Sequence, residues 1–162
     1  MDNQFLLSML CTHYLIQKLF CMSYVNIAVH AVWSTKKRES VITDEILMQL
    51  CNHIKSNAKE KNIFIDTING HEDHMHALMN LRPDLNIGNQ MQLIKGESSH
   101  WVNSASLLSK HFGWADEYFA ESVSPDRMEI VRAYIRNQKE HHKKISFDDE
   151  LKNFLKNFNL GE

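Results

Sequence analysis

The sequence has 162 residues, enough for one domain with a hydrophobic core and too few for a typical two-domain enzyme. Hydrophobic residues make up 43% and charged residues 23%, while 5 Gly and 2 Pro are too few for a low-complexity chain. The formal net charge of -2 excludes a uniformly basic protein that coats nucleic acid, although it leaves room for a local basic face.

The first 21 residues differ from the rest in pattern. Residues 1–21 lack the positive start and the cleavage site of a secretory signal, and polar residues interrupt the run before it could span a membrane. Met22 follows directly and a strand pattern then begins. We expect residues 1–21 to be an extension outside the domain and residues 22–162 to be a single domain; a packed amphipathic helix over residues 1–21 is the alternative.

Hydrophobic periodicity predicts an alternation of strands and helices. The expected elements are a strand over 24–33, a helix over 43–61, strands over 63–68 and 75–81, a helix over 87–107, an extended segment over 118–122, a helix over 124–144 and a short helix over 147–160. This order predicts an α+β fold, a ferredoxin-like βαββαβ antiparallel sheet with helices on one face and an added C-terminal helix.

The segment His74-Met75-His76 is the sharpest local motif. On a strand, residues i and i+2 point to the same face, so two imidazoles would stand side by side at a separation that suits one divalent metal. Glu72 and Asp73 strengthen the metal interpretation, since a carboxylate often accepts the other ring N–H of a ligand histidine. Two ordinary half-exposed histidines are the alternative.

The expected helix over 124–144 carries a second group of polar residues. Tyr134, Gln138 and either His141 or His142 lie on one helix face. From Arg132 to Lys144 there are five Lys or Arg residues and one Glu, a local positive charge that would suit a phosphate backbone or a solvated surface.

A second basic segment, Lys36-Lys37-Arg38, follows the first strand. The neighbouring Trp33 could stack on a base, but we expect it in the core. The three cysteines are odd in number and lack C-x-x-C spacing, so a disulfide framework and a cysteine zinc site are unexpected, and a reduced cytoplasmic compartment fits best.

Taken in order, these segments resemble the single-tyrosine transposases of the smallest bacterial insertion sequences, a group of the HUH nuclease superfamily that includes the REP-associated tyrosine transposases. The matching stretches are VHAVWSTKKR, GHEDHMHALM, LIKGESSHW, GWADEYFAESVS and YIRNQKEHHKKISF. The pairing of HMH on a strand with a later Y-x-x-x-Q in a basic helix is the most specific feature. Residues 1–21 lie outside the resemblance.

The resemblance implies a set of site residues. His74 and His76 correspond to the metal-binding histidine pair, Tyr134 to the nucleophile on a C-terminal catalytic helix, and Gln138 to the third metal ligand. Backbone contacts to DNA are expected from five basic residues: Lys36, Lys37, Arg38, Lys95 and Arg132.

The resemblance also implies an activity, a metal and partners. It implies cleavage and rejoining of single-stranded DNA with hairpin ends through a 5'-phosphotyrosine, with no nucleotide cofactor. Mg²⁺ or Mn²⁺ is the implied metal, although the ligand types alone also admit Co²⁺, Ni²⁺ and Zn²⁺. A homodimer with composite active sites is implied, together with action at the nucleoid in the cytoplasm and no membrane partner.

Three other functions remain open at this point. A domesticated relative would bind or cut hairpin repeats without moving an element. A ferredoxin-like nucleic-acid binder would use His74 and His76 only structurally. A metal-dependent phosphoesterase would use water as the nucleophile, with Tyr134 as a packing residue.

Overall fold

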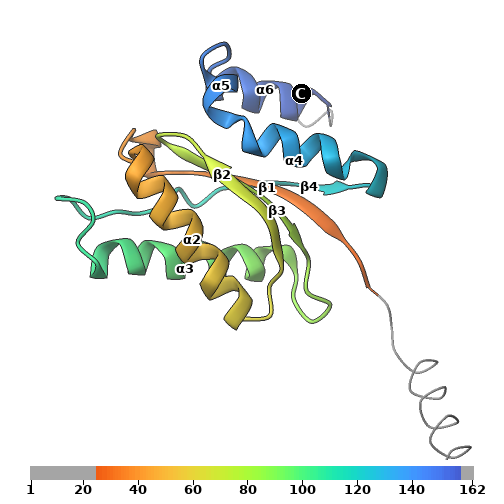
Figure 1. Ribbon diagram of the computed structural model, residues 1–162, viewed down its shortest axis with the longest axis horizontal. Coiled ribbons are helices and arrows are strands. Elements are labelled where there is room, and N and C mark those ends of the chain that lie inside the picture. The colour runs from red at the N-terminus through yellow and green to blue at the C-terminus, as the bar shows by residue number, and fades with distance from the viewer. Residues whose placement is uncertain (1–24, 158–162) are drawn as a thin grey trace, which may run out of the picture.

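The computed structural model describes residues 25–157, which form an antiparallel sheet with helices on both faces (Figure 1). In chain order its elements are β1 (Ala28–Ser34), η1 (Lys36–Arg38), α2 (Asp44–Glu60), β2 (Ile65–Gly70), β3 (His74–Asn80), α3 (Ile87–Ser104), β4 (Phe119–Val123), η2 (Pro125–Arg127), α4 (Met128–Arg136), α5 (Gln138–His142) and α6 (Phe147–Asn157). The proposed extension over residues 1–21 lies outside the described residues.

The sheet has the strand order β2-β3-β1-β4, and all neighbouring strands are antiparallel. With α2 joining β1 to β2 and α3 joining β3 to β4, this order is the ferredoxin-like fold, as the sequence predicts. Helices α2 and α3 cover one face, and α4, α5 and α6 cover the other (Figure 1).

Capping residues fix the starts of the two long helices. The Thr43 side chain accepts a hydrogen bond from the backbone N–H of Ile46 at 3.3 Å, and the Asn86 side chain accepts one from Asn89 at 2.8 Å. Each bond satisfies an N–H that has no partner within its own helix. The apolar stripe of α2 then faces the sheet with Leu50 buried.

Strand alternation divides the apolar side chains between the two sheet faces. The large core lies beneath α2 and α3 and includes Trp33, Met75 and Met79, so the expected core position of Trp33 is confirmed. A smaller cluster on the opposite face joins Leu78 of β3 to Ile135 of α4. Alternate residues of β3 point to the same face as Leu78. His74 and His76 therefore face the helical layer of α4, α5 and α6.

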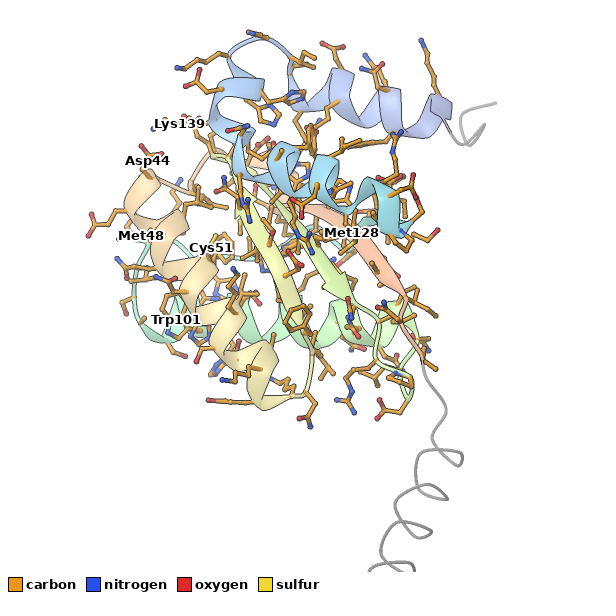
Figure 2. All side chains as sticks on the ribbon, turned by 45° about the vertical axis from the view of Figure 1, so that its right-hand side comes forward. Asp44, Met48, Cys51, Trp101, Met128 and Lys139 are labelled. Atoms are coloured by element: carbon orange, nitrogen blue, oxygen red, sulfur yellow. The ribbon has the colours of Figure 1, made fainter. Side chains whose placement is uncertain are left out.

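The expected continuous helix over 124–144 is wrong in detail. The chain instead forms η2, α4 and α5, with the break at Asn137, whose backbone N–H is shared between the carbonyls of Ala133 and Tyr134 at 3.1 and 3.2 Å. At Asn137 φ is -98° and ψ is 20°, outside the helical range. Beyond the break, Lys139 of α5 contacts Asp44 at the start of α2, 2.5 Å from Nζ to Oδ2 (Figure 2).

The last described helix, α6, agrees with the helix expected over 147–160 for as far as the chain is described. Its Phe154 side chain packs against Phe119 of β4, with ring centroids 5.0 Å apart. Helix α6 therefore lies against the sheet face that carries His74 and His76.

Candidate metal and nucleophile site

The two strand histidines are fully buried side by side on β3. Their ring centroids are 5.1 Å apart, and the exposed fraction of each residue is 0%. The Nδ1–H of His74 donates to Oδ1 of Asp73 at 2.7 Å, so in the neutral ring the Nε2 atom carries a lone pair. The Nε2 atoms of His74 and His76 have no hydrogen-bond partner among the described residues.

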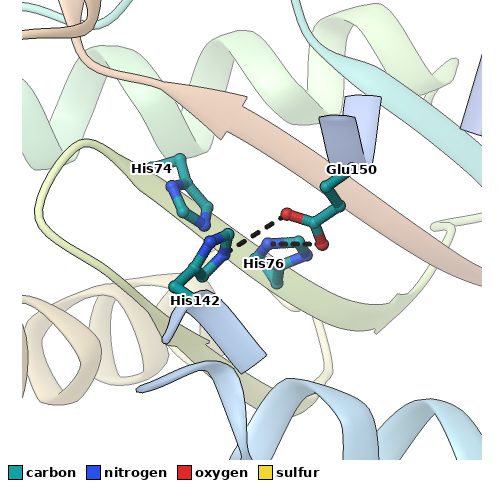
Figure 3. Close-up of side chains that lie close together, drawn as sticks. All are labelled: His74, His76, His142 and Glu150. Carbon is teal, nitrogen blue, oxygen red and sulfur yellow. Dashed lines mark ion pairs between the residues drawn. The ribbon is translucent and has the colours of Figure 1, made fainter. Parts of the chain in front are cut away.

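His142 of α5 and Glu150 of α6 complete a cluster with this pair (Figure 3). One ligand atom from each of the four side chains lies within 4.8 Å of the others. Glu150 Oε2 is 3.3 Å from His142 Nε2, and Glu150 Oε1 is 3.6 Å from His76 Nε2. Three imidazoles and one carboxylate are a donor set that suits a divalent transition metal.

The contacts of the His142 ring favour a cation at the centre of the cluster. Its Nδ1 lies 3.0 Å from the carbonyl oxygen of Ile145 and its Nε2 lies 3.0 Å from Oε1 of Gln138. A neutral imidazole has one N–H, so with Nδ1–H donating to Ile145 the Nε2 lone pair faces the oxygens of Gln138 and Glu150. Lone pairs from several side chains thus converge, and a bound cation would satisfy them together.

Burial shifts the pKa values of three members of the cluster toward their neutral forms. It lowers the pKa of His76 well below its ordinary value, with His74 contributing further, and it lowers the pKa of His142 to about 4. Burial also raises the pKa of Glu150 to about 8, helped by the negative charge of Asp73. Neutral imidazoles are the form that binds metals, and a cation would favour the ionised form of Glu150.

Tyr134 projects from α4 next to the histidine pair. Its ring centroid is 5.6 Å from that of His76 and 5.0 Å from that of His141, with the rings edge to face in both cases. Tyr134 also borders a surface hollow that Asn137 and Lys144 help to line. Within a single chain, the tyrosine is therefore adjacent to the metal-binding cluster and also reaches the surface.

Gln138 lies behind His142 at the start of α5. It is fully buried; its Oε1 contacts His142 Nε2, and its amide group donates to the carbonyl of Tyr134 at 3.5 Å. The structure therefore brings together His74, His76, Tyr134 and Gln138, the four residues expected from the sequence. Gln138 as a direct metal ligand stays a prediction.

The sequence does not identify two members of the cluster as metal ligands. Its pattern places His142 or its neighbour His141 on the helix face of Tyr134 and Gln138 but gives neither a role as a ligand, although the double histidine after Gln138 is a usable signal. Glu150 was missed entirely, because an acidic residue at the start of a polar helix is ordinary. Only the placement of α6 over β3 reveals it.

The five residues predicted to contact DNA lie in three different settings. Lys36, Lys37 and Arg38 form η1 at the end of β1, where the Arg38 guanidinium lies 4.3 Å from the ring centroid of Phe147. Lys95 donates to the backbone carbonyls of Asp116 and Glu117, 2.8 and 3.3 Å away.

Arg132 is held in an ion pair. Its guanidinium donates two hydrogen bonds to the carboxylate of Asp66, at 2.8 and 2.6 Å, and a third to Glu129. This arrangement links α4 to β2 and leaves less of the guanidinium for a phosphate. DNA contacts by these five residues stay predictions.

Comparisons with known proteins place this chain among transposases. A sequence model of a family described as transposase IS200 like matches residues 23–138. The ISDra2 transposase TnpA of Deinococcus radiodurans is 25% identical over 114 residues, which cover 67% of this chain and 81% of that protein. The chain belongs to the IS200-like transposase family. His142 and Glu150 lie beyond the matched residues.

Two solved structures share the fold. A crystal structure of a transposase from Deinococcus radiodurans R1 has a TM-score of 0.59 and 25% identity, covering 72% of this chain and 95% of that chain. A REP-associated tyrosine transposase bound to a REP hairpin has a TM-score of 0.55 and 17% identity, covering 76% and 73%. No helix among residues 25–157 is long and apolar enough to cross a membrane.

Proposed function

We propose that this transposase cuts and rejoins single-stranded DNA, with Tyr134 as the nucleophile and with His74 and His76 holding a divalent metal. The main observation in support is the position of the Tyr134 ring, which contacts His76. Beside it lies a buried cluster of possible ligand atoms, several of which have no hydrogen-bond partner among the described residues. Membership of a transposase family supports DNA as the substrate.

The residues present fit a divalent metal. His74 and His76 would supply two ligands, and His142, Glu150 or Gln138 would supply the others. The ion would neutralise charge on the phosphate oxygens during the reaction. Of the two metals that the family resemblance implies, the nitrogen-rich donor set favours Mn²⁺ over Mg²⁺, which prefers oxygen ligands.

Tyr134 would carry the covalent step. Its hydroxyl oxygen forms a bond to phosphorus while the bond from phosphorus to the 3' oxygen breaks, and the hydroxyl proton is lost as the 3' oxygen gains one. The products are a 5'-phosphotyrosine and a free 3'-hydroxyl. Attack by a different 3'-hydroxyl reverses the step and joins strands, so that ATP is not needed.

The DNA partner would be a single strand that folds into hairpins. The solved relative bound to a REP hairpin supports this choice. We propose phosphate contacts from Lys36, Lys37 and Arg38, because η1 follows the strand that neighbours His74 and His76. A homodimer is proposed from the family resemblance.

The testing experiment uses a labelled single-stranded oligonucleotide with a hairpin taken from DNA flanking the gene, incubated with protein and Mn²⁺ or Mg²⁺. On a denaturing gel we expect a slow covalent protein–DNA band that is lost in Tyr134→Phe. Tyr118→Phe is the matched control, because Tyr118 is a partly exposed tyrosine near Lys95 on the face covered by α3. Cleavage that survives in Tyr134→Phe would show that water is the nucleophile.

The second candidate function is a nuclease for hairpin repeats that does not move an element. Its support is the shared fold with the hairpin-bound REP-associated relative. The same reaction, supplied with a second strand bearing a free 3'-hydroxyl, separates the two functions. A transposase forms the joined product, whereas a repeat nuclease stops at the covalent adduct or at cleavage.

A further inference from the structure

A chain of three side chains runs across three neighbouring strands beneath the cluster. His30 of β1 lies between Glu121 of β4 and His76 of β3. Its Nδ1 is 3.0 Å from Oε1 of Glu121 and its Nε2 is 3.1 Å from Nδ1 of His76. His30 is 1% exposed, and none of these contacts is used by the reaction described above.

The strand register builds this alignment. His30 is directly opposite Glu121 on β4 and Leu78 on β3, which places it diagonal to His76 on the same sheet face. The imidazole planes of His30 and His76 differ by 16° and their centroids are 5.4 Å apart. Two rings lying edge to edge in nearly one plane, with nitrogens 3.1 Å apart, have the geometry of an N–H···N hydrogen bond.

The acceptor at the end of the chain sets the direction of every bond. An ionised Glu121 can only accept, so Nδ1 of His30 carries the hydrogen and, in the neutral ring, Nε2 of His30 has a lone pair. That lone pair accepts the Nδ1–H of His76. The remaining nitrogen of neutral His76, Nε2, is then left with a lone pair that points toward Glu150 and the cluster.

The opposite arrangement of neutral rings is unfavourable for two reasons. A hydrogen on Nε2 of His30 would leave Nδ1 as a lone pair facing the Glu121 carboxylate. It would also place the His76 hydrogen on Nε2, where it would block a metal. Asp73 accepts the Nδ1–H of His74 directly, which leaves a lone pair on Nε2 of His74. His76 has no adjacent carboxylate at Nδ1, so the same tautomer of His76 depends on its bond to His30.

We infer that Glu121 and His30 are positioning residues that hold His76 in the tautomer whose Nε2 binds the metal. The inference deepens the proposed function and rests on it, because it concerns the same metal site. Partners of this kind raise the basicity of a ligand imidazole and fix its ring, and their loss typically costs about 10- to 100-fold in metal affinity.

The test is a titration of the metal-free, full-length chain with Mn²⁺, followed by the loss of the free-ion electron paramagnetic resonance signal. His30→Phe keeps a flat ring but removes both hydrogen bonds, and we expect Mn²⁺ affinity to fall about 10- to 100-fold. His30→Gln can donate to Glu121 and accept from His76, and should recover most of the affinity.

The matched control is His53→Phe, which removes a histidine that bonds to Glu97 at 2.8 Å outside the cluster. Its Mn²⁺ affinity should equal that of the unmodified chain. Unchanged affinity in His30→Phe would overturn the inference, as would equal losses in His30→Gln and His30→Phe. If the unmodified chain does not bind Mn²⁺, the metal part of the proposed function fails and the inference fails with it.

A second measurement needs no variant. Long-range ¹H–¹⁵N NMR of the unmodified, metal-free protein distinguishes protonated from unprotonated ring nitrogens. We expect hydrogens on Nδ1 of both His30 and His76 and none on either Nε2. A hydrogen on Nε2 of His76 would overturn the inference even if the His30 variants fail to fold.

Discussion

At the scale of single residues, Glu150 adds a carboxylate to the side chains that could bind the metal. His74, His76, His142 and Glu150 together could supply four protein ligands to one ion. Mn²⁺ and Mg²⁺ prefer six ligands, so such an ion would still have room for phosphate oxygens. Glu150 is the only carboxylate of the four and lies on α6, beyond the residues matched by the family model.

We expect Glu150→Gln to lower Mn²⁺ affinity by about tenfold or more in the absence of DNA, because a neutral amide is a weaker ligand than a carboxylate. Calorimetric titration with Mn²⁺ measures the change. Asp149→Asn is the matched control, since the Asp149 side chain is exposed on the same helix. An unchanged affinity in Glu150→Gln would mean that Glu150 covers the cluster without binding the ion.

The residues of the site differ in how far the sequence reveals them. The shared face of His74 and His76 follows from strand spacing. The roles of Tyr134 and Gln138 beside that pair come from the family resemblance. Neither spacing nor resemblance indicates Glu150, since its contact with β3 depends on the turn after α5. The same holds for the bond between His30 and His76, which requires knowing that β1 pairs with β3 and in which register.

At the scale of elements, the turn between β2 and β3 positions His74. A Cβ added to Gly70 would lie 2.3 Å from the carbonyl oxygen of His74 and 2.8 Å from the sulfur of Met75. The His71 N–H donates to the same His74 carbonyl at 3.0 Å, so the backbone here is closely packed and hydrogen-bonded. The approach of the strands at Gly70 thus requires a residue without a side chain.

We therefore expect Gly70→Ala to destabilise the fold by about 1–3 kcal/mol, because backbone atoms must move to admit the methyl group. Urea denaturation measures this loss, and Mn²⁺ titration tests whether His74 is displaced. Gly96→Ala in α3 is the control, since a Cβ there meets nothing within 4 Å. That change should stabilise the helix by about 0.5–1 kcal/mol, and equal losses in both variants would contradict the prediction.

Helix α4 is tied to the sheet by the ion pair between Arg132 and Asp66. Two hydrogen bonds from Arg132 lower the pKa of Asp66 below its ordinary value of 3.8. Since the pKa is lower in the folded state, the pair stabilises the protein above the ordinary pKa, and this contribution is lost as the pH falls through the folded value.

For Asp66→Asn we expect a Tm about 1–3 °C lower at pH 7, a modest effect because the pair is partly exposed to solvent. Thermal unfolding measured between pH 7 and pH 2.5 should show that the Tm difference between Asp66→Asn and the unmodified protein decreases as the pH falls. Asp84→Asn serves as a control, because Asp84 pairs with Arg82 only two residues away within a loop. A Tm difference that grows toward low pH would contradict a stabilising role for ionised Asp66.

Sequence patterns predict the elements better than their ends. Helix α2 and the strand order follow from apolar periodicity and from the βαββαβ connection, because each face must bury its apolar side chains. The break at Asn137 was not predicted, since neither Gly nor Pro interrupts that helix. At the break one N–H is shared between two carbonyls, as is common at helix ends, and side-chain patterns do not encode this arrangement.

At the scale of the whole molecule, the two faces of the sheet have different tasks. The face beneath α2 and α3 holds the larger apolar core, and the opposite face carries the buried histidines under α4, α5 and α6 (Figure 1). The cluster draws its ligand atoms from β3, α5 and α6. A bound ion would therefore join segments that are separate in the sequence, and its binding free energy would add to the stability of the fold.

We expect Mn²⁺ at 100 times its Kd to stabilise the unmodified chain by about 2.7 kcal/mol, or about 5–10 °C in Tm for a protein of this size. Hydrogen exchange should slow in α6, because Glu150 would bind the same ion as His76 of β3. His76→Ala should abolish both effects, since it removes a central ligand. A Tm that rises equally in His76→Ala would show that Mn²⁺ stabilises the protein at a different place, and slowed exchange confined to β3 would remove α6 from the site.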